Sequence, residues 1–222
     1  NKRMAGMKLA EPWLPEVYEL VSEETELLHQ SREEDERIQN AYLKNMTAQE
    51  EDFSGLCFSR VKFENCSFEG CNFEKAEFSD VLFISCNFSN CLFRDSFLRR
   101  VSFQRSKGTG ARMTESSLKD VTITDCSMQY LNLDDSKLES FRVEDTDLEN
   151  GNFAQCKCKG VTFSQVRLQN ASFFKTPLKG MDFTTCDIKG LVLSDECSEV
   201  RGAVMDLYQA AELAKRLGIV IK

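Results

Sequence analysis

The chain repeats every five residues, and this period restricts its fold more than any other feature. From residue 53 to residue 193 every fifth residue is apolar, except for Gly108, which gives 29 consecutive five-residue units. Fourteen of the 17 phenylalanines lie at these central positions. A period of five fits neither an α-helix, at 3.6 residues per turn, nor a strand, at two. The backbone must therefore turn once in each unit.

Two further positions of each unit support this interpretation. Two residues before each centre, from residue 56 to residue 191, the side chain is small or apolar and is never charged. Two residues after each centre, turn-forming residues recur, as at Gly55, Asn65, Asp80 and Asn90. Such residues tolerate a left-handed backbone or bond to their own main chain. Each unit should therefore place two side chains inward, turn a corner and expose its remaining residues.

The units at residues 66–70 (Cys-Ser-Phe-Glu-Gly) and 86–90 (Cys-Asn-Phe-Ser-Asn) resemble the A(D/N)LXX-type unit of the pentapeptide-repeat family. The resemblance covers roughly residues 51–195 and implies an all-β solenoid, a right-handed quadrilateral β-helix with four units per coil. The units then make about seven coils, which stack at about 4.8 Å into a rod of about 35 Å. One interior stack should contain Phe53, Phe73, Phe93, Met113, Leu133, Phe153, Phe173 and Leu193.

Three segments are predicted along the chain: a helical N-terminal cap at residues 1–50, the repeat at 51–195, and a C-terminal helix and tail at 196–222. Residues 16–28 and 31–44 are expected to form the helices of the cap. A cap is needed because a solenoid end exposes its core and an unpaired strand edge. Gly108 and Gly110 suggest a local bulge or bend.

The ten cysteines are predicted to be packing groups rather than disulfide partners or metal ligands, and no cofactor is predicted. Seven occupy the small inward position, Cys158 is central, and only Cys57 and Cys197 lie off both; the seven are Cys66, Cys71, Cys86, Cys91, Cys126, Cys156 and Cys186. This use of cysteine suits a reducing compartment. No apolar stretch reaches membrane length and no charged-then-apolar leader is present, so a cytoplasmic location is predicted.

An enzyme is not predicted. His29 is the only histidine and lies in the expected cap, so no Ser/His/Asp or Cys/His arrangement can form across the solenoid. Paired acids such as Asp134 and Asp135 occupy outward positions, where solvation leaves them unsuited to acid–base catalysis.

The C-terminal segment indicates which group of pentapeptide-repeat proteins the chain resembles. Leu207, Ala210, Ala211, Ala214 and Leu217 form a helical stripe, and Gly218 terminates it. Gln209-Ala210, Leu213 and Leu217-Gly218-Ile219, followed by Ile221, resemble the C-terminus of the Qnr quinolone-resistance proteins, and the uninterrupted repeat resembles their loopless chromosomal type. The resemblance implies a homodimer, with an interface at Leu207, Ala210, Leu213, Ala214, Leu217, Ile219 and Ile221.

The formal net charge is −8, which disfavours direct nucleic-acid binding. Seven acids lie close together in the sequence and are predicted to point to water as a partner-binding acidic face: Asp134, Asp135, Glu139, Glu144, Asp145, Asp147 and Glu149. A basic band precedes them, at Arg94, Arg99, Arg100, Arg105, Lys107 and Arg112.

The Qnr resemblance implies a function for this charge. It implies an acidic rod that mimics DNA, binds DNA gyrase or topoisomerase IV and protects the enzyme from fluoroquinolones, by steering an acidic surface to a basic groove. The alternative is a pentapeptide-repeat scaffold or interaction protein with a different protein partner and no topoisomerase role.

Overall fold

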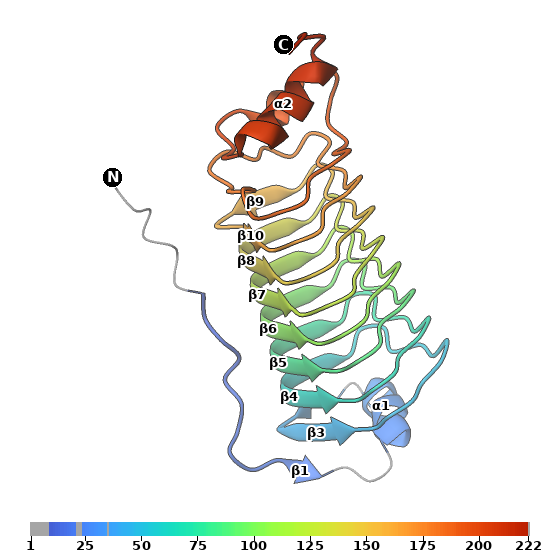
Figure 1. Cartoon of the computed structure of the whole chain (residues 1–222). Coiled ribbons are helices and arrows are strands. Elements are labelled where there is room, and N and C mark those ends of the chain that lie inside the picture. The colour runs from blue at the N-terminus through green and yellow to red at the C-terminus, as the bar shows by residue number, and fades with distance from the viewer. Residues whose placement is uncertain (1–8, 21–23, 35, 222) are drawn as a thin grey trace.

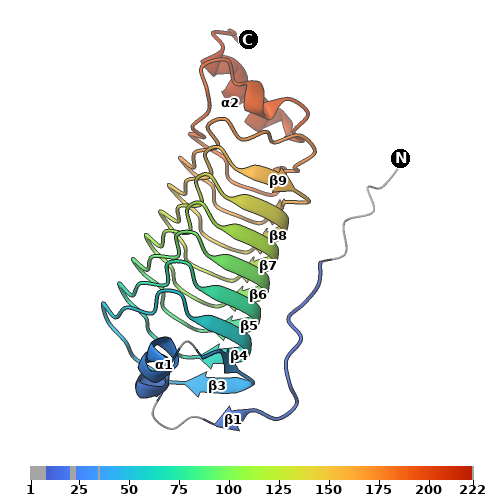
Figure 2. The same cartoon turned by 180° about the vertical axis from the view of Figure 1, so that it is seen from behind.

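The computed structural model describes residues 9–20, 24–34 and 36–221, which form a four-sided parallel β-solenoid with a helix near each end (Figures 1 and 2). The first elements in chain order are β1 (Glu19–Leu20), α1 (Glu24–Glu33), β2 (Ile38–Gln39) and β3 (Ala41–Lys44). The long strands follow: β4 (Cys57–Glu64), β5 (Glu77–Ile84), β6 (Phe97–Gln104), β7 (Ser117–Thr124) and β8 (Lys137–Glu144). The chain ends with β9 (Lys157–Lys159), β10 (Thr162–Ser164), η1 (Ser198–Val200) and α2 (Leu207–Arg216).

Neighbouring strands are offset by one coil of 20 residues. Phe58 pairs with Phe78, which pairs with Leu98, and all strand pairs are parallel. The sheet has the order β1-β3-β4-β5-β6-β7-β8-β10, with β2 beside β4 and β9 beside β8. Each long strand spans two sides of the solenoid, and isolated bridges with the same offset, such as that between Ser67 and Asn87, join the other sides. The predicted solenoid of five-residue units is confirmed.

The corners carry the backbone turn that the period requires. Every fifth residue from Asn40 to Gly190, except Thr185, has a positive φ. Many are neither Gly nor Asn, including Arg60, Glu115 and Tyr130, and a left-handed backbone costs such residues roughly 1–2 kcal/mol. Stacking offsets this cost because a corner N–H bonds to the next coil, as the Tyr130 N–H does to the Glu149 carbonyl at 2.9 Å. The stacked coils therefore impose a conformation that single residues disfavour.

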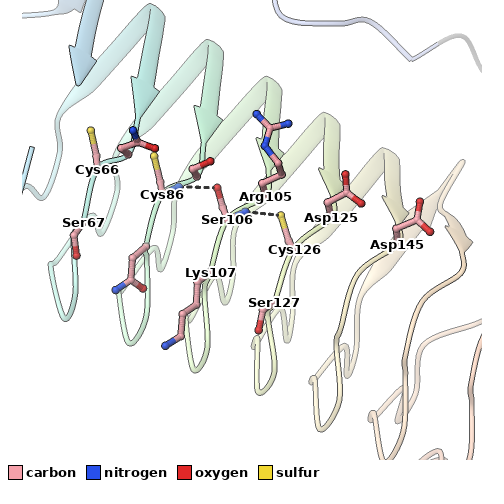
Figure 3. A pocket seen from close by; sticks show the side chains of 13 residues that line it. Cys66, Ser67, Cys86, Arg105, Ser106, Lys107, Asp125, Cys126, Ser127 and Asp145 are labelled. Atoms are coloured by element: carbon pink, nitrogen blue, oxygen red, sulfur yellow. Dashed lines mark hydrogen bonds between the residues drawn. The ribbon is translucent and has the colours of Figure 1, made fainter. Parts of the chain in front are cut away.

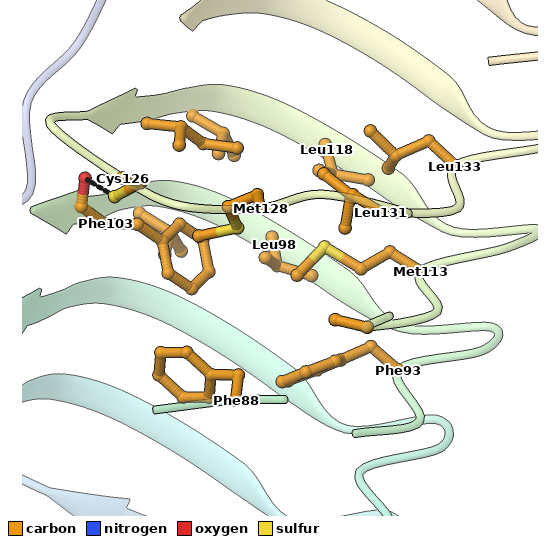
Figure 4. Close-up of a cluster of buried hydrophobic side chains, with 14 of the residues drawn as sticks. Phe88, Phe93, Leu98, Phe103, Met113, Leu118, Cys126, Met128, Leu131 and Leu133 are labelled. Carbon is orange, nitrogen blue, oxygen red and sulfur yellow. Dashed lines mark hydrogen bonds between the residues drawn. The ribbon is translucent and has the colours of Figure 1, made fainter. Parts of the chain in front are cut away.

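The interior is a set of ring and aliphatic stacks along the rod axis. The Phe53 and Phe73 ring centroids are 5.4 Å apart, and those of Phe73 and Phe93 are 5.1 Å apart with planes at 9°. Such pairs add roughly 0.5–1.5 kcal/mol beyond the area they bury. Figure 4 shows the transition from Phe88 and Phe93 to the leucines and methionines of the later coils. The predicted interior stack is confirmed, since its members are all buried.

Gly108 is the one central position without a side chain, and Met128 of the next coil fills the space. A Cβ on Gly108 would lie 2.8 Å from the Met128 Sδ. The Gly108 N–H still donates to the Ser127 carbonyl at 2.9 Å, so the ladder of hydrogen bonds between coils continues. The bulge or bend suggested by Gly108 and Gly110 is therefore wrong.

The N-terminal segment differs from its predicted form. The helix expected over residues 31–44 is wrong, because β2 and β3 lie there and pair with β4. Ile38, Leu43 and Ala48 are buried on the five-residue grid, so the first coil begins before residue 51. The helix expected over residues 16–28 is displaced: residues 19–20 form β1, α1 begins at Glu24, and residues 21–23 lie outside the described residues. In the described part of the chain, no helix combines the length and apolar character needed to cross a membrane.

Candidate interaction surfaces

Outward side chains form columns along the rod, because residues 20 apart occupy the same position in successive coils. Residues five apart lie on successive sides of one coil instead. Charges that are close in the sequence are therefore separated around the rod, and charges far apart in the sequence are stacked. This geometry decides which of the predicted surfaces exist.

The seven acids predicted as a partner-binding face surround the rod. They belong to four successive units, at residues 131–135, 136–140, 141–145 and 146–150, and these units form the four sides of one coil. Asp135 and Asp145, ten residues apart, lie at opposite corners. The structure therefore does not bring the seven acids together on one face.

Several of these acids are also engaged within the chain. The Asp134 Oδ1 accepts the Ala154 N–H at 2.7 Å, and burial raises the pKa of the Asp134 carboxyl. The Glu139 Oε1 lies 3.2 Å from the Lys119 Nζ, and the Asp147 Oδ2 lies 3.5 Å from the Arg167 Nη1. The expectation that all seven point freely to water is wrong for these three residues, whereas Asp135 and Asp145 are exposed.

Acidic columns are present at two corners. Asp95, Glu115 and Asp135 follow one another in successive coils, with the Arg94 Nε 3.0 Å from Glu115 and 4.0 Å from Asp95. Asp125 and Asp145 stack at another corner, where Figure 3 shows both side chains pointing away from the coil. These columns, rather than the segment at residues 134–149, are the acidic surfaces of the rod.

The basic band of the sequence is divided in the same way. Arg94 contacts Glu115, whereas Arg100 forms a two-point contact with Asp80 and is only partly exposed. Arg99 and Lys107 are exposed on different sides of the coil, since they belong to different five-residue units. The six residues do not form one surface.

One corner carries alternating charges: Asn40, Arg60, Asp80, Arg100 and Asp120 follow one another in successive coils. The Arg100 Nε and Nη2 each donate to an Asp80 carboxylate oxygen at 2.6 Å. Burial alone would raise the pKa of Asp80, which is only 7% exposed, but the hydrogen bonds from Arg100 and the Trp13 N–H lower it below its usual range. Asp80 is therefore an ionised group fixed in place from two directions.

An extended N-terminal arm, residues 9–18, lies along this corner and crosses several coils (Figure 2). The Ala10 N–H donates to the Asp120 Oδ1 at 3.3 Å, and the Trp13 N–H donates to the Asp80 Oδ1 at 3.0 Å. The Arg60 guanidinium lies 5.7 Å from the centroid of the Trp13 ring. This docking site was not predicted from the sequence. Its signal was the recurrence of Arg and Asp at a spacing of 20 residues.

The inward cysteines occupy the position predicted for them. All seven are buried, and all ten cysteines of the chain are thiols outside disulfides. Figure 3 shows Cys66, Cys86, Ser106 and Cys126 in one row beneath a shallow groove, where the Cys86 N–H donates to the Ser106 Oγ at 3.1 Å. Burial raises the pKa of Cys126 to about 11 and that of Cys156 to about 12. Thiolates, the form that binds metals or attacks substrates, are therefore scarce at neutral pH.

Of the two cysteines outside the inward and central positions, Cys197 is buried and Cys57 is half-buried. Cys158, at a central position, is also only half-buried. In the described residues no group of three His, Cys, Asp or Glu side chains is placed to hold a metal ion. His29 packs at the lower end of the solenoid, with its ring centroid 5.5 Å from that of Phe53 and its Nε2 3.5 Å from Glu51.

Comparison with protein families agrees with this geometry. A model of the pentapeptide repeat region matches residues 56–133 and 76–153, and a model of eight pentapeptide repeats matches residues 152–190. The chain belongs to the pentapeptide-repeat family. A search of curated proteins finds no match.

Among solved pentapeptide-repeat structures, the chain is similar to a trypsin-treated variant of QnrB1, described as a plasmid-mediated fluoroquinolone resistance protein. The two are 26% identical, with a TM-score of 0.52, over 84% of this chain and 92% of that one. A second trypsin-treated QnrB1 variant is 24% identical, with a TM-score of 0.47, over 84% and 93%. HetL from Nostoc sp. strain PCC 7120, involved in heterocyst differentiation regulation, is 13% identical, with a TM-score of 0.25, over 80% and 95%.

The C-terminal segment lies beyond the matched pentapeptide repeats. The predicted helix is present as α2, which begins with a capping box: the Asp206 Oδ1 accepts the Gln209 N–H, and the Gln209 Oε1 accepts the Asp206 N–H. The Gln209 Nε2 donates to the carbonyls of Phe183 and Cys186 and ties α2 to the last coil. Leu207, Leu217, Ile219 and Ile221 are between 50% and 80% exposed, while Leu213 packs against the core.

Proposed function

We propose that this pentapeptide-repeat protein binds a type II topoisomerase, DNA gyrase or topoisomerase IV, and protects the enzyme from fluoroquinolones. The observation that carries the proposal is the similarity to QnrB1 at 26% identity along 84% of the chain. The proposal places the protein in the cytoplasm, where these enzymes act, and assigns it a binding rather than a catalytic function.

The acidic corners supply the attraction in this proposal. Asp95, Glu115 and Asp135, and on another corner Asp125 and Asp145, present carboxylates at a spacing of about 4.8 Å along the rod. A linear array of negative charge complements a basic groove that normally holds DNA, and such complementarity chiefly raises the association rate. The remaining acids of the 134–149 segment contribute as part of the overall negative field.

Homodimerisation is part of the proposal. Most of the large apolar side chains of α2 and of the tail after it are exposed in one protomer, and a second copy would cover them across a two-fold axis. The interface would include Leu207, Ala210, Leu213, Ala214, Leu217, Ile219 and Ile221. Two rods joined at their C-terminal ends would present two sets of acidic columns, one on each rod.

The decisive experiment is a DNA gyrase supercoiling assay inhibited by ciprofloxacin and titrated with the purified protein. We expect supercoiling to recover as the protein is added. Replacement of Asp95, Glu115 and Asp135 by Asn, Gln and Asn should weaken this recovery more than the same chemistry at Asp135, Glu144 and Asp145, because only the first set is a column. No recovery and no gyrase binding by the parent protein would refute the proposal.

The alternative function is a scaffold with another protein partner. One observation favours it: several acids are already paired with cations of this chain, including Glu139 with Lys119 and Asp147 with Arg167. Such pairing reduces the charge available to a DNA-mimicking surface. Normal folding and dimerisation without any gyrase binding would support the scaffold function.

A further inference from the structure

One side of the rod is basic although the chain as a whole is acidic. We define the lysine face as the outward residues of the units 96–100, 116–120, 136–140, 156–160 and 176–180, which include β9 and the first halves of β6, β7 and β8. The face holds seven basic and two acidic residues: Arg99, Arg100, Lys119, Lys137, Lys157, Lys159 and Lys179 against Asp120 and Glu139. One of its basic residues, Arg100, is paired with Asp80 of the preceding coil, which leaves four of the five surplus positive charges unneutralised. With a total of −8, the remainder of the chain carries thirteen more acids than bases.

The pairing register places like charges beside each other on this face. Arg99 pairs directly with Lys119 across β6 and β7, and Lys137 pairs directly with Lys157 across β8 and β9. Like charges at such positions repel and destabilise a sheet. Some cations elsewhere on the rod are paired with acids instead, as Arg94 is with Glu115 and Lys62 is with Glu64.

Only part of this repulsion is relieved within the chain. Glu139 lies between Lys119 and Lys159, at 3.2 and 4.0 Å from their ammonium groups. Arg99, Lys137, Lys157 and Lys179 are exposed and form no ion pair with the described residues. An anionic ligand would remove the repulsion, so the face is complementary to a polyanion.

An exposed aromatic ring lies at the N-terminal end of the face. Phe97 is 59% exposed, belongs to the same strand as Arg99, and lines a shallow groove with it. A ring beside a row of cations offers a stacking surface for a base and phosphate contacts along one strand. An acidic amphipathic helix would require a continuous apolar stripe, and the outward positions of this face are instead dominated by cations.

We propose that the lysine face binds single-stranded nucleic acid, with the phosphate chain running along the rod axis and a base stacked on Phe97. From Arg99 to Lys179 the face spans four coil steps, roughly 19 Å at about 4.8 Å per step, which accommodates several nucleotides. This inference does not depend on topoisomerase binding. It revises the expectation, based on the net charge, that the chain does not bind nucleic acid. The coils place basic and acidic side chains on different sides of the rod, so one side is basic although the net charge is −8.

The test measures the fluorescence anisotropy of a labelled 20-nucleotide oligo(dT) titrated with the full-length protein at 50 and 200 mM salt. With about four phosphate contacts, the slope of log affinity against log salt should be near −3, so affinity should fall about 50-fold between these concentrations. The variant R99Q/K137Q/K157Q/K179Q should lose at least tenfold in affinity at 50 mM salt and most of the salt dependence.

A matched control removes four exposed cations from other sides of the rod, in the variant R105Q/K107Q/R112Q/K189Q. Both variants have the same net charge, but the control should bind oligo(dT) like the parent. Phe97→Ala should weaken binding severalfold without changing the salt slope, since it removes stacking and no charge. Circular dichroism should show intact solenoids in all variants.

Four results would overturn the proposal: no binding of oligo(dT) by the parent at 50 mM salt, equal loss in the two quadruple variants, tighter binding of poly-glutamate than of oligo(dT), or preferred binding of duplex DNA with no effect of Phe97→Ala. Gyrase protection by the lysine-face variant would show separately whether the proposed topoisomerase function holds.

Discussion

At its N-terminal end the solenoid is covered by its own chain, whereas at its C-terminal end a helix leaves apolar side chains in solvent. Leu28 of α1 is fully buried, β1 pairs with the edge strand β3, and Arg32 contacts Asp52 at 2.6 Å. In contrast α2 has no buried residue, and the apolar residues within and after it are largely exposed. The core of a coil must be shielded from water at both ends. At the N-terminal end the shielding side chain of Leu28 is itself buried, whereas at the C-terminal end the helix that covers the coil has no buried residue. This difference is the reason for proposing that a second copy of the chain covers the C-terminal end.

The largest expected effect is on the oligomeric state and comes from changing the C-terminal end. Replacing Ile219 and Ile221 by Glu, or deleting residues 207–222, should convert a dimer into a monomer or, for the deletion, an aggregate, because charge or loss of the tail removes the apolar contact. Multi-angle light scattering should show the mass of the double variant halved. The control is Val17→Glu, which charges an exposed apolar residue in the N-terminal arm and should leave the mass unchanged. A parent protein that is already monomeric would contradict the proposal that a second copy covers the C-terminal end.

The next effect compares one leucine at each end. Leu28→Ala should lower the free energy of unfolding by about 2–5 kcal/mol, since it empties a buried site under α1. Leu207→Ala, made in the I219E/I221E background so that only one protomer is measured, should change it by less than about 0.5 kcal/mol because Leu207 is 80% exposed. Urea unfolding followed by circular dichroism measures both. Equal losses would mean that the two ends are closed alike.

A buried cysteine between the two ends provides a reference for these losses in the free energy of unfolding. Cys86→Ala should cost about 1 kcal/mol through lost volume, because Cys86 is 2% exposed. The half-buried Cys158 should tolerate alanine with a smaller loss. The same urea experiment applies, together with metal analysis of the parent protein. Stoichiometric zinc, or a disulfide among the inward cysteines, would disprove their assignment as packing groups.

The smallest effect on the whole fold should come from releasing the N-terminal arm. The pKa of Asp80 is below its ordinary value of 3.8, so the stability it contributes is complete above about pH 5 and is lost as pH falls through the lower, folded-state pKa. Asp80→Asn should release the arm at pH 7, because it breaks the two-point contact with Arg100 and weakens the bond from Trp13. Trp13 is the only tryptophan, so its fluorescence anisotropy reports the arm alone.

In the parent, this anisotropy should drop only in acid, and in Asp80→Asn it should be low at pH 7. Asp120→Asn is the matched control on the same corner. Its bond to Ala10 is longer, at 3.3 Å, and exposed, so its effect should be smaller. Identical anisotropy in the parent and Asp80→Asn would show that the arm is held by other contacts.

The interior of the rod could be predicted from the sequence because packing is local to each unit. The five-residue grid identified the buried phenylalanines and the inward cysteines residue by residue. It would also have identified Ile38, Leu43 and Ala48, but the charged run at residues 32–37, just before them, favoured a helix. The five-residue period in fact continued for three more units, and the charged run concealed it.

The surface could not be predicted in the same way, because its neighbours are 20 residues apart. The segment at residues 134–149 is acidic in the sequence, yet its carboxylates face every side of the coil. The docking of Trp13 beside Asp80 joins residues 67 positions apart, and no short window of sequence contains both. Reading the chain in steps of 20 would have revealed the alternating corner and the lysine face.

The constant offset of 20 residues between coils also determines how such a protein can change its length. Duplicating or removing a whole coil keeps every later residue in its column, so the corners and the lysine face continue unbroken. Inserting a single five-residue unit preserves the interior equally well but rotates all later coils by a quarter turn. A surface shared by several coils is then divided between two sides while the core is unaffected. Selection for folding alone would accept either event, and only selection for a partner that spans several coils would distinguish them.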